Sequence, residues 1–133
     1  MISDWLSAGD LIKARVEAQV TGLARVQIVS GVTEAAQIVT EDKSCYVAWV
    51  GDSASDHAGY GAAALMSQRW QIILAVRPGQ SPGVTLSSII TAMSGYELSD
   101  YFDGVRFMGG AQAVFTGDFA LYPLTFEVAI FAG

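Results

Sequence analysis

One long alternating stretch, SQRWQIILAVR at residues 67–77, constrains this fold more than any other part of the chain. Large apolar side chains occupy every second position: Trp70, Ile72, Leu74 and Val76. Polar side chains occupy positions between them: Arg69, Gln71 and Arg77. Because successive side chains of a strand point to opposite faces, this period of two predicts a long β-strand with one buried face.

Four further stretches have the composition of strands: 25–30, 45–51, 104–109 and 119–131. The stretch 45–51 is apolar on both faces, which is typical of a strand in the middle of a sheet. In the last stretch, Pro123 has no backbone N–H to give to a ladder. We therefore expect it to mark a sheet edge or a bulge near the start of that strand.

Three helices are predicted between these strands. Ser3 or Asp4 is placed to cap the first helix, which ends near Gly22. Its expected buried stripe recurs at steps of three and four: Trp5, Ala8, Ile12, Val16, Val20 and Leu23. A short helix follows Gly31, and a third covers 84–95.

The resulting order is α-β-α-β-β-α-β-β, which predicts an α+β fold in a single domain over 1–133. We expect a mostly antiparallel sheet of four to five strands with the helices packed on one face, because some consecutive strands have no helix between them. A projecting loop is expected at about 52–66, where DSASDHAGYGAAA begins.

Charged residues make up 15% of the chain, below the usual share of about a quarter, so we expect neighbouring subunits to cover part of the surface. The net charge is −6 and the basic residues are scattered, which argues against direct DNA binding. Cys45, the sole cysteine, is expected to be a buried filler. The N-terminus lacks the pattern of a signal peptide and the apolar runs are too short to span a bilayer, so no membrane partner is expected.

The loop at 52–66 carries the residues that most resemble catalytic groups. His57 is the only histidine, and Asp52 or Asp56 could orient it in a small hydrolytic or ligand-binding domain. No second histidine or paired-carboxylate cluster accompanies it, so an exposed histidine without chemistry is favoured, with the aspartates as ordinary loop residues.

Other candidate sites fail in similar ways. GYGAAA at 59–64 matches a dinucleotide fingerprint on paper but leads toward a strand, with no acidic residue about twenty positions on. Asp100 and Asp103 are interpreted as parts of a solvated turn. Core packing is expected for Trp70 and Trp49. The sequence therefore predicts no enzyme, no cofactor, no metal site and no catalytic residue.

The order of features carries a family resemblance over nearly the whole chain. An amphipathic helix leads into RVQIVSGVTEAAQIVTEDKSCYVAWVGD, and a variable loop ends in SQRWQIILAVR, where a glutamine and a tryptophan enter the long strand. MSGYELSD, VRFMGG and PLTFEVAIF follow. This pattern resembles the tail terminator family of long-tailed bacteriophages, particularly the branch in Mu-like phages and prophages.

The resemblance implies a structural role in the virion, with synthesis in the host cytoplasm. Members of that family form a homohexameric ring at the head-proximal end of the tail tube. The ring stops tube growth and offers a docking surface to head-completion or connector proteins, while genomic DNA passes through its lumen without specific binding. The alternative within this class is another head–tail joining protein or a tail-tube protein.

On this interpretation the loop becomes an arm that contacts the tube, the next subunit or the connector. Tyr60 is its expected anchor, because aromatic groups contribute strongly to binding. The predicted protein-interface residues are Asp56, His57, Tyr60, Arg69 and Arg77.

Overall fold

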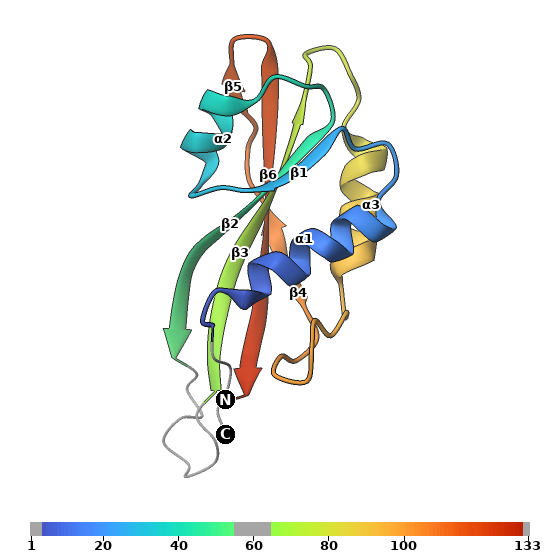
Figure 1. The fold of residues 1–133 in the computed structure, drawn as a ribbon. Coiled ribbons are helices and arrows are strands. Elements are labelled where there is room, and N and C mark those ends of the chain that lie inside the picture. The colour runs from blue at the N-terminus through green and yellow to red at the C-terminus, as the bar shows by residue number, and fades with distance from the viewer. Residues whose placement is uncertain (1–3, 55–64, 132–133) are drawn as a thin grey trace.

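A computed structural model of the 133-residue chain describes residues 4–54 and 65–131 (Figure 1). In the described part, the order of elements is α1 (Ser7–Gln19), β1 (Arg25–Ile28), α2 (Val32–Ile38), β2 (Ser44–Ala54), β3 (Leu65–Val76), α3 (Gly83–Met93), β4 (Arg106–Gly110), β5 (Val114–Thr116) and β6 (Phe119–Phe131). The predicted α-β-α-β-β-α-β-β order is confirmed, with the three-residue β5 added before the last strand.

All the strands belong to one sheet with the order β1-β2-β3-β6-β4, and β5 pairs with β6 beside β4. The β1–β2 pair is parallel, and the other pairs are antiparallel. The predicted α+β class with a mostly antiparallel sheet is therefore confirmed. The described sheet has six strands rather than four or five, because β5 is too short to be recognised from its sequence.

The alternation in β3 separates two cores. Trp70, Ile72 and Leu74 belong to the core beneath α1 and α3, together with Ile12 and Ile89. Ile73 and Ala75 belong to a second, smaller core on the other face, with Ala35 of α2. Gln71 is the last polar residue within β3. The part of β3 between Gln71 and its end at Val76 is therefore buried on both faces, and the part that includes Arg69 is covered on one.

The position of α2 corrects the expectation that all helices pack on one face. Helices α1 and α3 lie on one face of the sheet, whereas α2 packs on the opposite face through Ala35 (Figure 1). A seven-residue helix has only two turns and one fully buried side chain, so its sequence does not indicate which face it covers.

Pro123 also lies where the sequence did not place it. Strand β6 is central, and Pro123 is opposite Ile73 of β3, so the prediction of an edge or a bulge is wrong. Its carbonyl accepts a hydrogen bond from the N–H of Ala111, 3.0 Å away. In an antiparallel strand the N–H and C=O of one residue face the same neighbour. The missing donor therefore faces the gap between β4 and β5, where no ladder bond is lost.

Both ends of the predicted loop at 52–66 belong to strands, and residues 55–64 lie outside the described residues. Strand β2 continues to Ala54 and strand β3 begins at Leu65. Asp52 pairs with Gln68, and Ala54 pairs with Met66.

Helix α1 begins at Ser7, so Asp4 does not cap it and instead accepts a hydrogen bond from the N–H of Leu6. Among the described helices, none has the length and apolar character needed to cross a membrane.

Candidate functional site

The exposed large apolar side chains of the described residues gather at the two opposite edges of the sheet. One group lies where the N-terminal segment and β1 meet β2: Trp5, Leu6, Ile28, Trp49 and Val50. The other lies on β4 and β5: Phe107, Met108, Val114 and Phe115. We call the first the groove edge and the second the β4–β5 edge. Only Val84 and Tyr101 are exposed in this way elsewhere in the described chain.

A groove forms at the first edge because β1 is short. It pairs with β2 only as far as Ile28 and Val47, so the later part of β2 leaves its outer side open among the described strands. The groove has a volume of about 710 Å³. Its lining is mostly apolar, with two carboxylates and no lysine or arginine: Asp4, Leu6, Gly9, Asp10, Ile28, Val29, Ser30, Trp49, Val50, Gly51 and Trp70.

A polar network fixes the N-terminal segment against this groove. The indole N–H of Trp5 donates to one carboxylate oxygen of Asp52 over 2.7 Å, and that of Trp49 donates to the other over 2.9 Å. Gln68 is fully buried; its amide nitrogen donates to the Trp5 carbonyl, and its oxygen accepts from the indole of Trp70. The sequence suggested that Asp52 is an ordinary loop residue, and this is wrong. Asp52 belongs to strand β2, and its carboxylate binds the indoles of two tryptophans.

The position of Trp49 corrects a second expectation. Its side chain is 40% exposed at the sheet edge, whereas Trp70 beside it is 2% exposed in the core, so core packing accounts for Trp70 and not for Trp49. Trp5, expected in the buried stripe of the first helix, precedes α1 and is 39% exposed.

The two edges are connected by a single row of aromatic residues across the sheet. Trp49 pairs with Trp70, Trp70 with Phe126, and Phe126 with Phe107. The Phe126 and Phe107 ring centroids are 5.3 Å apart. The middle of this row is buried, while its two ends, Trp49 and Phe107, are partly exposed.

Each edge strand has a register irregularity next to this row. In β2 the shift falls between Trp49 and Gly51, and in β4 it falls between Phe107 and Gly109. The extra residues, Val50 and Met108, are both exposed. Bulges are common at sheet edges, where they bend the strand and change the direction of a side chain. Here they leave one apolar side chain at each edge, next to the ends of the aromatic row.

A second row contains charges. Arg106 of β4 is opposite Glu127, Glu127 is opposite Arg69, and Arg69 is opposite Gly51. Glu127 lies 3.5 Å from Arg69 and 3.7 Å from Arg106, and these arginine side chains are 54% and 72% exposed. Solvent screens such pairs, so each contributes less than about 1 kcal/mol.

The predicted interface residues do not form one cluster. Arg77 follows β3 at the far end from Arg69, about 26 Å along the strand at 3.3 Å per residue. Its guanidinium lies 5.5 Å from the ring of Phe119. Asp56, His57 and Tyr60 lie outside the described residues, so their role at an interface stays a prediction.

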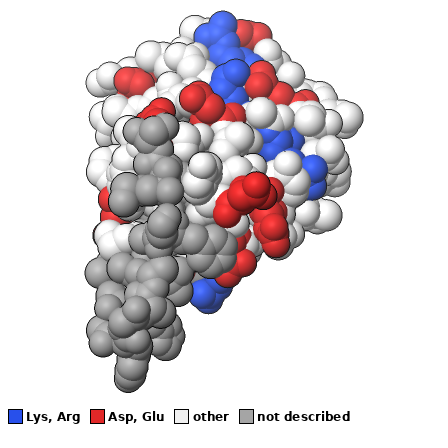
Figure 2. All heavy atoms as spheres, turned by 60° about the horizontal axis from the view of Figure 1, so that its bottom comes forward, with Lys and Arg blue, Asp and Glu red and all other residues white. Residues whose placement is uncertain are grey.

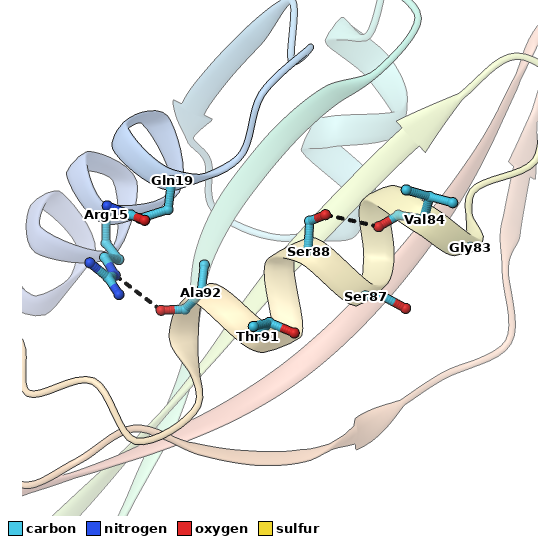
Figure 3. A pocket seen from close by; sticks show the side chains of 8 residues that line it. All are labelled: Arg15, Gln19, Gly83, Val84, Ser87, Ser88, Thr91 and Ala92. Carbon is cyan, nitrogen blue, oxygen red and sulfur yellow. Dashed lines mark hydrogen bonds between the residues drawn. The ribbon is translucent and has the colours of Figure 1, made fainter.

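A shallow hollow lies between α1 and α3, and two of the polar side chains that line it are hydrogen-bonded within the protein (Figure 3). It is about 580 Å³ in volume. Arg15 donates to the carbonyl of Ala92 over 3.0 Å and lies 3.9 Å from the centre of the Tyr96 ring. Ser88 donates to the carbonyl of Val84. The polar groups drawn with dashed lines in Figure 3 therefore already serve to join and shape the two helices.

The described residues contain neither a metal-binding cluster nor a reactive thiol. Residues 4–54 and 65–131 contain no group of three or more metal-ligating side chains. Burial raises the pKa of the Cys45 thiol to about 12, so it is not a nucleophile at neutral pH. Asp103, exposed, accepts from the N–H of Gly104, as expected of a turn. On the face shown in Figure 2, basic residues are interspersed with acidic and uncharged ones and form no continuous basic stripe.

Comparisons with known proteins identify one family and one similar fold. The chain matches the phage tail terminator protein family over residues 2–133. Its fold is similar to a chain in the solved virion of a native gene transfer agent (GTA) particle, with 15% identity and a TM-score of 0.66, covering 97% of this chain and 100% of that chain. No curated protein matches the chain significantly.

Proposed function

The chain belongs to the phage tail terminator family, whose members are structural, non-enzymatic virion proteins. We propose that its copies close into a ring at the head-proximal end of a tail tube. The ring ends tube polymerisation and provides the surface on which the head's completion or connector proteins dock. Six copies per ring is the number that the family resemblance implies.

The observation that carries this proposal is the pair of unlike apolar edges on one sheet. A ring needs two different patches on each subunit, which meet head to tail and close after a fixed number of copies. The groove edge is concave and holds Trp49 and Val50, whereas the β4–β5 edge presents Phe107, Met108 and Phe115. The two edges differ in shape and in their exposed residues, which supports a heterologous contact between one edge and the other.

The charge of the chain fits the passage of DNA through such a ring. Six copies would carry roughly −36, which is six times −6. Like charges repel, so an acidic lumen lets DNA pass without holding it. The proposed partners are therefore further copies, the tail tube protein and the connector, and the proposed location is the virion tail.

The predicted arm is part of the same proposal. Tyr60, with Asp56 and His57, would contact the tube, the next subunit or the connector. Replacing Tyr60 by alanine in the phage tests this: we expect fewer correctly joined particles, and normal joining would contradict a role for Tyr60.

The main test compares two assemblies. Mass photometry of the purified chain, and electron microscopy of it on tail tubes, should show one closed ring of uniform copy number at one end of the tube. A tube protein would instead form filaments of indefinite length. Phage lacking the protein should produce tubes of irregular length that do not join heads. Tails of normal length, correctly joined without the protein, would overturn the proposal.

A further inference from the structure

The structure points to the identity of the partner in the groove. Resting on the proposed ring, we propose that the groove edge of one subunit receives the β4–β5 edge of the next copy, with Phe107 and Met108 against Trp49 and Val50. A second copy of this chain is therefore the occupant of the groove. Three features of the two edges carry this inference: height, strand direction and charge.

Height is the first feature. Trp49 and Phe107 are the two ends of one cross-strand row, and the bulged residues Val50 and Met108 lie directly beside it. Height here means the position of a row along the strand direction. A rotation about an axis parallel to the strands leaves this position unchanged. Successive copies related by such a rotation therefore bring the Phe107 end of one row to the Trp49 end of the next.

Strand direction is the second feature. Three successive antiparallel pairs, β2 with β3, β3 with β6 and β6 with β4, make β4 run opposite to β2. In a head-to-tail arrangement, β4 of one copy therefore lies antiparallel to the open part of β2 in the next. Antiparallel strands can exchange backbone hydrogen bonds, so the contact also satisfies groups that an open edge leaves exposed.

Charge is the third feature. The groove lining includes Asp4 and Asp10 and no basic residue. The stretch 106–116, which forms the other edge, has Arg106 as its single charged residue, and its side chain is 72% exposed. The apolar surfaces supply the area of contact. The carboxylates of the groove disfavour a contact between two groove edges, whereas the β4–β5 edge brings no acidic residue to the groove.

Cysteine cross-linking in assembled tails tests the proposal directly. The double variant Val50→Cys, Met108→Cys places a thiol on each bulge, and Cys45 can stay because it is buried. On mild oxidation we expect covalent ladders that extend to the full ring. The matched control, Val50→Cys with Val84→Cys, moves the second thiol to α3, where 81% of the Val84 side chain is exposed, and should give no ladder.

An added carboxylate gives a second readout. Met108→Asp should reduce the fraction of subunits in rings by roughly tenfold or more, because the new charge would face the acidic groove of the next copy. Val84→Asp, at an exposed position on α3, is the control with the same change of charge. Thermal unfolding confirms that each variant folds.

The outcomes separate this inference from the proposed function. Intact rings without a Val50–Met108 ladder, or with a ladder to the tube protein instead, would overturn the assignment of the groove and leave the ring standing. If the unmodified protein formed no rings on tails, both the assignment of the groove and the proposed function would be overturned. A Val50–Met108 ladder together with the loss of rings in Met108→Asp supports the groove as the site of the next copy.

Discussion

The groove edge and the β4–β5 edge belong to the same sheet, but they differ in how the rest of the described chain covers their open strands. At the groove edge, the N-terminal segment is held against β2 and β3 by Asp52 and Gln68, and the open part of β2 forms one wall of the groove. At the other edge, nothing in the described chain covers β4 and β5, and Phe115 is 73% exposed. A concave edge and a bare edge on one subunit are what a closed ring requires.

The largest expected effect comes from placing a charge at either edge. Val50→Glu or Met108→Glu should each abolish ring formation, because the contact would bury an uncompensated charge at about 3–5 kcal/mol per interface. Mass photometry measures the loss. Val84→Glu, at an exposed position on α3, should leave rings intact. If one edge tolerated the charge, that edge would not be part of the ring contact.

A substitution in the groove floor should distinguish the two edges. A Cβ on Gly9 would lie 2.8 Å from Cη2 of the buried Trp70, so Gly9→Leu forces α1 away from the sheet. Such overpacking costs about 1–3 kcal/mol of unfolding free energy. Chemical denaturation measures this, with Ala14→Leu at an exposed position of α1 as the control. An unchanged stability would show that α1 can move without cost, and the groove would then not be a rigid site.

Removing the carboxylate that holds two indoles should loosen the groove edge only. Asp52→Ala should lower stability by about 1 kcal/mol, because these hydrogen bonds are partly exposed to water. Hydrogen exchange of the indole N–H groups, followed by NMR, should become faster for Trp5 and Trp49. The indole of Trp70, which donates to Gln68, is the internal control and should not change. Equal changes in all three would indicate general unfolding instead.

Smaller effects are expected for the ion pairs on the sheet surface. Arg69→Ala should cost at most about 1 kcal/mol of stability, since its pair with Glu127 is screened. Arg106→Ala should have a similarly small effect, because its pair with Glu127 is also screened. Chemical denaturation measures both substitutions. A loss well above about 1 kcal/mol from either one would show that this row of charges is shielded from solvent.

The smallest effect concerns Cys45, in the part of β2 that β1 covers. Its folded pKa of about 12 exceeds the ordinary value of 9.0, so the folded state holds this proton more tightly than the unfolded state. The resulting stability is fully present below pH 9 and is lost as pH rises toward 12. Thiol alkylation at pH 8 should therefore occur only after unfolding. Rapid alkylation of the native protein would show that the covered half of β2 is also open.

The local patterns of the sequence predicted much of the sheet. The alternation of Trp70, Ile72 and Leu74 identified β3 and its buried face, and the order of elements gave the fold class and the family resemblance. These predictions succeeded because a period of two is a local property of the chain. The predicted interface residues stay a prediction: Arg69 and Arg77 are on the surface but far apart. The sequence indicated neither of the two apolar edges.

The reason for that miss lies in pairings between distant residues. Whether Trp49 is buried depends on how far β1 extends along β2, and β1 ends at Ile28, opposite Val47. The role of Asp52 depends on Trp5, which is 47 residues away. The one local signal was the pair of glycines, Gly51 and Gly109, at positive φ beside exposed apolar residues in strand-like stretches, where a bulge forms.

The sequence by itself determined which stretches are strands and helices and which side chains share a face, because backbone geometry repeats over a few residues. The tertiary structure decided which strands are neighbours: it placed Pro123 in a central strand, α2 on the second face, and Trp49 and Phe107 at opposite ends of one row. Strand neighbours are chosen by packing across the whole domain. The exposed edges, and with them the proposed ring contact, exist only at that level.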